Sequence, residues 1–144
     1  MRFLDVKTDY AFKKVFGSED SKCILINFLN AIIDFEGNDK IIDLTTIADP
    51  YQIPLIKGMK ETYVDVKAIL SNNKRVIIEM QVLNVEGFEK RVLYNAAKTY
   101  SNQLQKAEIY STLELIIALT ITDFLMFEEI EKVITYFKLL EKSF

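Results

Sequence analysis

Two adjacent segments of the chain alternate between apolar and polar side chains, and this alternation constrains the fold more than any other feature. Over residues 62–70, the apolar set is Val64, Val66 and Ala68. Over residues 75–83, it is Val76, Ile78, Met80 and Val82. Successive side chains of a strand point to opposite faces, so a slip of one residue would turn a whole apolar set away from the core. The segments are therefore predicted to form an antiparallel hairpin that pairs Val66 with Ile78, closed by a three-residue turn at residues 71–73 or a longer odd-numbered loop.

The same register predicts that two acidic side chains face each other. Asp65 falls opposite Glu79 on the polar face, with Cβ atoms roughly 5 Å apart. Like charges in that position destabilise a sheet by an amount on the order of 1 kcal/mol, and one of the two pKa values should rise unless a cation lies there. A divalent ion would supply the charge, since carboxylate oxygens suit Mg²⁺. The alternative is that both are solvated acids on the exposed polar face of an ordinary sheet.

The remaining segments predict an α/β fold. Helical spacing of apolar residues indicates helices over residues 9–16, 23–33, 87–106 and 130–140. The aliphatic run at residues 113–122 is typical of a strand in the centre of a sheet, commonly with a parallel neighbour, and a β-branched run at residues 41–47 indicates another strand. The order of helices, hairpin, crossover helix and strand belongs to the α/β class with a mixed central sheet flanked by helices.

The longest predicted helix carries two stripes at helical spacing. The stripe expected to face the core consists of Leu93, Ala96, Ala97, Tyr100 and Leu104, with Phe88 at its start. The other stripe is polar and consists of Arg91, Asn95, Lys98 and Asn102. Arg91 and Lys98 are therefore candidates for contact with a phosphate, and Lys13 and Lys14 form a second pair; for each, the alternative is a solvated charge.

The chain contains no histidine, which excludes Ser-His-Asp triads, histidine-metal nucleases and His-ligated zinc. A net charge of −3 gives no global attraction for a polyanion, so nucleic-acid binding would need a local basic patch or a bound metal. The single Cys23 lies in an apolar run and is expected to pack in the core. With no signal peptide and no membrane-spanning apolar run, we expect one cytoplasmic domain over residues 1–144.

Several segments resemble one protein family. The strand pair ETYVDVKAI and RVIIEMQV, followed by FEKRVLYNAAKTYSNQL, is similar to the PD-(D/E)XK nuclease family transposases, also called Rpn recombination-promoting nucleases. The segments KTDYAFKKVFG, ILINFLNAII and YSTLELIIALTITDFLMF resemble that family in the same order. The resemblance implies a restriction-endonuclease-like αβββαβ core. Family members usually continue further with another strand and a helical region, so we expect this chain to lack a C-terminal extension.

The resemblance also implies roles for particular residues. Asp65 and Glu79 would bind Mg²⁺ or Mn²⁺, with the Met80 carbonyl as a candidate third ligand. Gln81 stands where the superfamily name has Lys; an amide carries no positive charge but can orient an attacking water, and members of this family similarly have Gln there. Lys67 falls on the acidic face in the predicted register and is a candidate for the missing cation.

Asp9, on the first helix, is a candidate additional acid, because many related nucleases carry one there. The alternative is a favourable charge at a helix N-terminus that forms an i,i+4 pair with Lys13.

The function expected from these observations is a metal-dependent DNA endonuclease linked to recombination or mobile elements. Its partners would be DNA and, as a further candidate, a second copy of the chain, with no membrane. The alternative is a catalytically inactive, truncated relative that acts as an interaction or regulatory module. A structural dimerisation domain is a third candidate, but it leaves the facing acids unexplained.

Overall fold

A computed structural model describes residues 4–33, 43–49, 51–52, 60, 62–71, 73–105 and 107–139. The helices are α1 (Asp9–Phe16), α2 (Lys22–Ile32) and α3 (Phe88–Ser101), with short 3₁₀ turns η1 (Glu19–Ser21) and η2 (Tyr110–Thr112). The strands are β1 (Leu44–Ala48), β2 (Tyr51–Gln52), β3 (Thr62–Tyr63), β4 (Val66–Leu70), β5 (Arg75–Gln81) and β6 (Ile116–Thr122). The expected α/β class with a mixed sheet and helices is confirmed.

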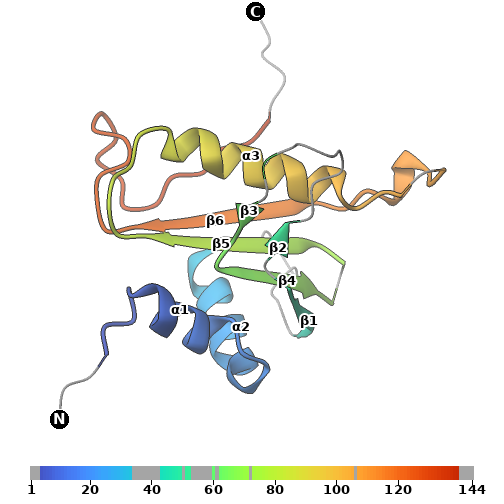
Figure 1. The fold of residues 1–144 in the computed structure, drawn as a ribbon, viewed down its shortest axis with the longest axis horizontal. Helices are drawn as coiled ribbons and strands as arrows, with labels where there is room; N and C mark the ends of the chain where they lie inside the picture. The colour runs from blue at the N-terminus through green and yellow to red at the C-terminus, as the bar shows by residue number, and fades with distance from the viewer. Residues whose placement is uncertain are drawn as a thin grey trace, which may run out of the picture.

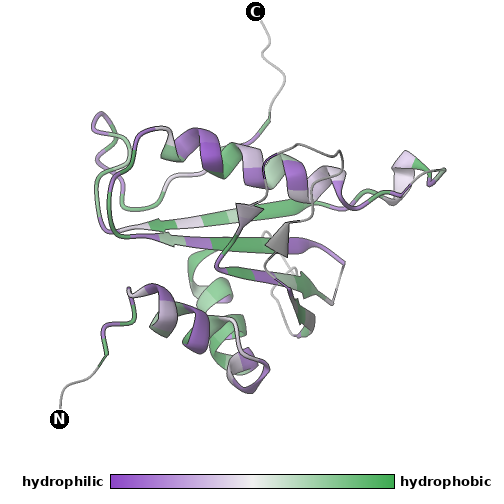
Figure 2. Ribbon diagram, in the orientation of Figure 1, coloured by the Kyte–Doolittle hydropathy of each residue, from purple (hydrophilic) through white to green (hydrophobic). Residues whose placement is uncertain are grey.

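The main sheet has four strands in the order β1-β4-β5-β6 and lies between two helical layers (Figure 1). Helices α1 and α2 cover one face, and α3 covers the other. The core between the sheet and α2 contains Leu25 and Leu29, which pack with Val66, Ala68 and Ile78 of the hairpin. Figure 2 shows that α2 and the central strands are mainly hydrophobic, whereas α1 and α3 are mixed.

The predicted hairpin register is confirmed over its central part. Strands β4 and β5 are antiparallel, with Val66 paired with Ile78 and Ala68 with Val76. The turn has three residues, because the Leu70 N–H donates to the Lys74 carbonyl at 2.9 Å. Asn73 ends the turn with a φ of 63°, a left-handed conformation that Asn tolerates better than most residues and that three-residue hairpin loops commonly use.

The predicted strand over residues 62–70 is interrupted. Its first part, β3, pairs with β2 in a separate two-stranded sheet, and its second part, β4, pairs with β5 and β1. Asp65 lies at the break. Its backbone N–H donates to the Ile78 carbonyl at 3.0 Å, although Ile78 is already the ladder partner of Val66. Two successive residues therefore share one partner, as in a β-bulge, and the direct pairing of Asp65 with Glu79 does not form.

Strand β6 confirms one prediction and corrects another. It runs parallel to β5, with Ile117 paired with Val76 and Thr120 paired with Glu79. Within the described ranges, however, β6 lies at the edge of the sheet and not at its centre. The predicted strand at residues 41–47 corresponds to β1, which begins at Leu44; residues 41 and 42 lie outside the described residues.

Two predictions about helical segments are also corrected. Residues 130–139 form no helix, and residue 140 lies outside the described residues. Val133 and Leu139 are fully exposed there, so the apolar stripe has no surface to cover, and short helices without such packing are marginal in water. Cys23 is exposed on α2 and not buried in the core. None of the helices in the described part of the chain is both long and apolar enough to cross a bilayer.

Helix α3 presents its stripes the opposite way from the prediction. Asn95 is 0% exposed and Lys98 is 5% exposed, whereas Leu93 is 71% and Tyr100 is 46% exposed. The middle of the polar stripe therefore faces the sheet and the middle of the apolar stripe faces outward, whereas Phe88, at the start of the helix, is buried as predicted. The reason is visible on β5, where a buried acid, Glu79, lies under α3 and requires polar partners.

Candidate active site

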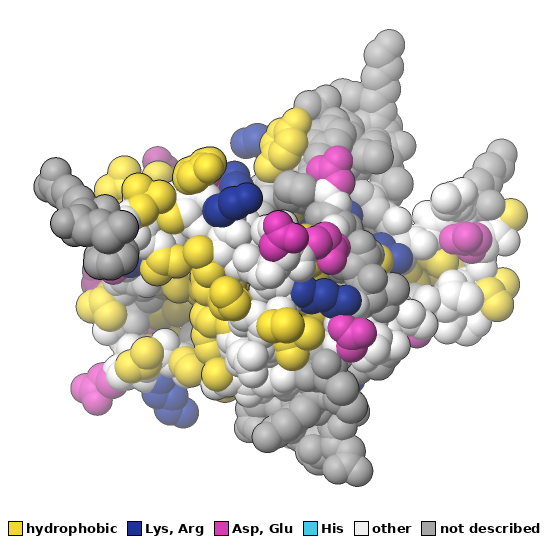
Figure 3. All heavy atoms as spheres, turned by 90° about the horizontal axis from the view of Figure 1, so that it is seen from below, with side chains coloured by type: hydrophobic (Ala, Val, Ile, Leu, Met, Phe, Trp, Pro, Cys, Tyr) yellow, Lys and Arg dark blue, Asp and Glu magenta, His cyan; other side chains and the backbone are white. Residues whose placement is uncertain are grey.

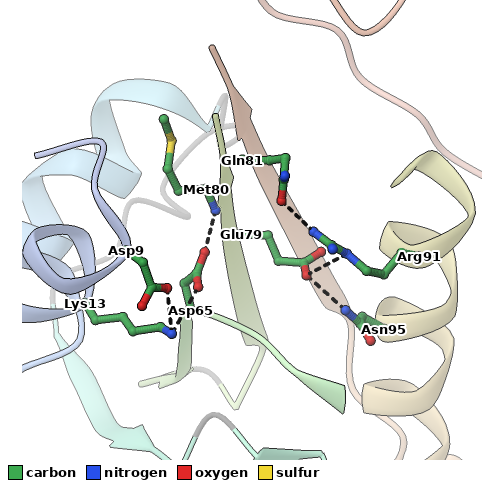
Figure 4. Close-up of polar contacts among 8 residues, drawn as sticks. All are labelled: Asp9, Lys13, Asp65, Glu79, Met80, Gln81, Arg91 and Asn95. Carbon is green, nitrogen blue, oxygen red and sulfur yellow. Dashed lines mark hydrogen bonds and ion pairs between the residues drawn. The ribbon is translucent and has the colours of Figure 1, made fainter. Parts of the chain in front are cut away.

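A cleft lies where the ends of β3, β5, α1 and α3 meet, and it brings together most of the predicted site residues. Those lining it include Asp9, Lys13, Asp65, Glu79, Gln81 and Arg91. Figure 4 shows Asp65 approaching the end of β5 from the side of α1 and Glu79 reaching from β5 toward α3. On the face of the molecule shown in Figure 3, acidic and basic side chains gather together beside a hydrophobic area.

Asp65 is fixed by the main chain of the neighbouring strand. Its Oδ2 accepts a hydrogen bond from the Met80 N–H at 2.6 Å. A carboxylate thus serves as the acceptor at a position where an uninterrupted ladder would offer a backbone carbonyl. Its other oxygen, Oδ1, lies 3.5 Å from the Lys13 ammonium of α1. The hydrogen bond from Met80 to Asp65 therefore accounts for both the break in the strand and the position of the acid.

Asp9 and Lys13 form the predicted i,i+4 ion pair on α1. The distance from Lys13 Nζ to Asp9 Oδ1 is 2.7 Å, so the ammonium lies between the carboxylates of Asp9 and Asp65. Asp9 also lines the cleft, which keeps it as a candidate additional acid. Lys13 is the site residue whose importance the sequence analysis underestimated, since it was ranked behind Arg91 and Lys98.

Glu79 is held from the opposite side, by α3. Its side chain is nearly buried, and Oε1 accepts a hydrogen bond from Asn95 Nδ2 at 3.0 Å. The Arg91 Nε lies 3.7 Å from the same oxygen. The sequence analysis identified Asn95 only as a member of the polar stripe of this helix and gave it no role in the site. The spacing of four residues between Arg91 and Asn95, on the stripe that meets an acidic strand, is the signal that could have identified it.

Arg91 also holds Gln81. Its Nη2 donates to Gln81 Oε1 at 2.8 Å, while Gln81 Nε2 donates to the Leu83 carbonyl at 2.7 Å. The guanidinium further stacks on Phe88, with 4.7 Å between its central carbon and the ring centroid. A planar guanidinium suits this shared role, because its several N–H groups point in fixed directions. Arg91 thus connects Glu79 and Gln81 in one network.

Both acids are held in surroundings that disfavour their charge. Burial raises the pKa of Asp65, while the Met80 hydrogen bond and Lys13 act in the other direction. Burial likewise raises the pKa of Glu79; Arg91 opposes that shift, and the negative charge of Asp65 adds to it. The sequence offered Lys67 as the cation beside the acids, but in the structure Lys13 approaches Asp65 and Arg91 approaches Glu79. The net shift is still upward for both, so an additional cation would stabilise the ionised pair.

Two predicted cationic residues lie elsewhere. Lys67 pairs with Ile77 on β5 and is not among the residues that line the cleft; burial lowers its pKa, and Arg75 adds to that effect. Lys98 donates from Nζ to the Lys60 carbonyl at 2.9 Å and more weakly to Thr62 at 3.4 Å. Lys98 therefore ties α3 to the start of β3, and its ammonium is directed into the protein and not toward a ligand at the surface.

The donor set fits a hard divalent cation. Asp65 and Glu79 offer carboxylate oxygens, the ligand type that Mg²⁺ and Mn²⁺ prefer. Among the described residues, no three acidic, cysteine or histidine side chains lie close enough to form a metal cluster. A metal bound here would be held by the carboxylates of Asp65 and Glu79, with the Met80 carbonyl still a candidate third ligand, and would complete its coordination with water or substrate oxygens, which is common for Mg²⁺.

Comparison with known protein families identifies a match over nearly the whole chain. A family model described as PD-(D/E)XK nuclease family transposase matches residues 6–144. A search of curated proteins found no match, and a search of solved structures also found none.

Proposed function

The chain belongs to the PD-(D/E)XK nuclease family transposases, and we propose that it is a metal-dependent DNA endonuclease. The family points to a nuclease linked to mobile elements and to DNA as substrate. The observation that carries the finer proposal is the pair Asp65 and Glu79, which line one cleft and whose pKa values are both raised. A nearly buried acid beside a half-buried one is costly for a purely structural sheet and useful for binding a dication.

In this proposal, Asp65 and Glu79 bind Mg²⁺ or Mn²⁺. Asp65 contributes Oδ1, because its Oδ2 is engaged by the Met80 N–H. Glu79 is oriented by Asn95 and Arg91, which fix the carboxylate without covering it completely. A bound divalent cation supplies Lewis-acid polarisation of a phosphodiester and lowers the pKa of a coordinated water.

Gln81 and Arg91 complete the proposed catalytic group. Arg91 and the Leu83 carbonyl fix the amide plane of Gln81, which leaves one N–H and one lone pair of the amide to orient a water. The guanidinium of Arg91 provides the positive charge that Gln81 lacks, in a position to contact a phosphate oxygen. Asp9 is retained as an additional acid at the cleft.

The fold supports this assignment at a finer level. We assign β1, β4 and β5 to the three consecutive strands of an αβββαβ core, preceded by α2 and followed by α3 and β6. In that assignment, β2 and β3 are additions, and residues 1–144 form one nuclease-like domain. DNA would be held by local positive charge, since the cleft is lined by Lys7, Lys13, Lys60 and Arg91 although the chain carries a net charge of −3. A cytoplasmic location remains a prediction.

The proposal is tested by plasmid nicking. Supercoiled DNA is incubated with the full chain and millimolar Mg²⁺ or Mn²⁺, and the same preparation is made for Asp65→Ala and Glu79→Ala. We expect metal-dependent nicking that both substitutions abolish. Nicking that survives in both variants would come from a contaminant or another site and would contradict the assignment.

One observation favours the second candidate, an interaction module without activity. The outward face of α3 carries the apolar side chains Leu93 and Tyr100, which an isolated enzyme domain does not need to expose. If the purified chain neither binds Mn²⁺ nor nicks DNA, this candidate replaces the endonuclease.

A further inference from the structure

In the proposed site, only one oxygen of Asp65 is available to a metal. Oδ2 is engaged by the Met80 N–H at 2.6 Å, and Oδ1 faces the Lys13 ammonium at 3.5 Å. Figure 4 shows the Lys13 side chain reaching from α1 with its ammonium between Asp9 and Asp65. A divalent cation that approaches Oδ1 therefore meets a positive charge that belongs to the protein.

We propose that Lys13 is a built-in competitor of the metal: its ammonium neutralises Asp65 when no divalent cation is bound and withdraws to Asp9 when one binds. This inference rests on the proposed function, because it concerns the same metal site. It goes further because it assigns to Lys13 of α1 the control of the metal concentration at which that site is filled.

The contacts of Lys13 suit such a movement. The distance to Asp9 is 2.7 Å, shorter than the 3.5 Å to Asp65, and Asp9 lies one turn away on the same helix. The Lys13 side chain is 42% exposed, and a lysine stem has four rotatable carbons, so the ammonium can leave Asp65 without moving α1. Partly exposed ion pairs are weak, so a dication can displace this one at modest cost.

The cation beside the other acid is held differently. Arg91 lies 3.7 Å from Glu79 but is also fixed by Gln81 and by the ring of Phe88. These two additional contacts keep the guanidinium in place while a metal binds. Among the described residues, Arg91 therefore has contacts beyond its acid that Lys13 lacks, so we assign the movable role to Lys13 and not to Arg91.

The test is a calorimetric titration of the full chain with Mn²⁺ in the absence of DNA, so that the readout is affinity and not activity. Lys13→Met removes the charge and keeps a side chain of similar length and helix propensity. Lys13→Arg keeps the charge. Lys14→Met is the matched control, because it removes an equal charge from the exposed adjacent position on α1. Far-UV circular dichroism confirms that each variant is folded.

We expect Lys13→Met to bind Mn²⁺ about fivefold more tightly than the unsubstituted chain, the effect of removing one exposed ion pair. Lys13→Arg and Lys14→Met should stay within about twofold of the unsubstituted chain. An unchanged or weaker affinity in Lys13→Met, with a normal affinity in the unsubstituted chain, would overturn the competitor role alone. Tighter binding in Lys14→Met as well would assign the effect to net charge and would also overturn it. If no variant binds Mn²⁺, the proposed metal site fails together with this inference.

Discussion

The carboxylate of Asp65 accepts a hydrogen bond from the backbone N–H of Met80 at 2.6 Å, so a side chain takes over the role of a main-chain acceptor at the end of the β4–β5 hairpin. This contact explains why the strand breaks at Asp65 and why the acid is held in a fixed position. It also separates two functions of the residue: its capacity to accept a hydrogen bond and its negative charge.

Asp65→Asn and Asp65→Ala should therefore differ in stability. Asn keeps an acceptor for the Met80 N–H and removes a charge that burial disfavours, so the metal-free protein should be as stable as the unsubstituted chain or more stable. Ala leaves the N–H without its acceptor and should lower the free energy of unfolding by about 1–3 kcal/mol. Urea denaturation at pH 7 measures both values. Equal stability of the two variants would show that the hydrogen bond contributes little.

Asn95→Asp should make the stability strongly dependent on pH. The new carboxylate would replace a fully buried amide that donates to Glu79, so two buried acids would repel each other at pH 7 and lower the free energy of unfolding by about 2 kcal/mol or more. At pH 5 a shared proton should restore most of this loss. Denaturation at the two pH values tests the prediction, with the exposed Asn84→Asp as control. A similar loss at both pH values would argue against charge repulsion.

How much of this arrangement the sequence predicts depends on the competing interactions at each position. The register of β4 and β5 was predictable, because only one pairing buries Val66, Ala68, Val76 and Ile78 together. The break at Asp65 was not, because side-chain acceptors such as a carboxylate can replace a backbone carbonyl without leaving a trace in the alternation pattern. Asp65 and Glu79 both line one cleft, but the prediction that they face each other directly across the hairpin is wrong, because Asp65 is held by Met80 and Lys13 whereas Glu79 is held by residues of α3.

Helix α3 shows where hydrophobic patterning misleads. The rule that an apolar stripe faces the core placed Leu93 and Tyr100 inside, whereas Asn95 and Lys98 are buried. The inner face of this helix meets Glu79 and the Lys60 carbonyl, and both require hydrogen-bonding partners. A single sequence does not show which polar groups will be buried on the opposite element, so the orientation of α3 could not be derived from its own periodicity.

Asp65 and Glu79 should raise the free energy of unfolding of the metal-free chain as the pH falls through their folded-state pKa values. Burial raises the pKa values of Asp65 and Glu79 above their ordinary values of 3.8 and 4.5, so the folded state retains protons that the unfolded state has released. The resulting stabilisation is present in full below those ordinary values and is lost as the pH rises through the folded-state pKa values.

Chemical denaturation of the unsubstituted chain and of the Asp65→Asn/Glu79→Gln double variant measures this dependence from neutral pH down to below the ordinary pKa values of 3.8 and 4.5. The double variant should lack the part of the slope that comes from these two groups, so the difference between the proteins should shrink as the pH falls. A constant difference over the whole range would mean that neither pKa is raised.

Arg91→Met should reduce nicking more than it changes metal affinity. The substitution removes the positive charge near the proposed reaction centre and releases Gln81, so the rate at saturating DNA should fall by about tenfold to a hundredfold. The affinity for Mn²⁺ should not fall, because the substitution removes the positive charge of Arg91 from beside Glu79. Arg91→Lys should recover part of the rate. A rate that falls only in proportion to lost DNA binding would reduce Arg91 to a phosphate contact.

The most direct test of the account is the thermal stability of the chain with and without millimolar Mn²⁺, compared with Asp65→Asn and Glu79→Gln. Ligands that bind only the folded state raise the melting temperature, so the unsubstituted chain should melt higher with Mn²⁺, and each single substitution should abolish that increase. A melting temperature that Mn²⁺ leaves unchanged, or an increase that survives in both variants, would show that Asp65 and Glu79 do not form one metal site.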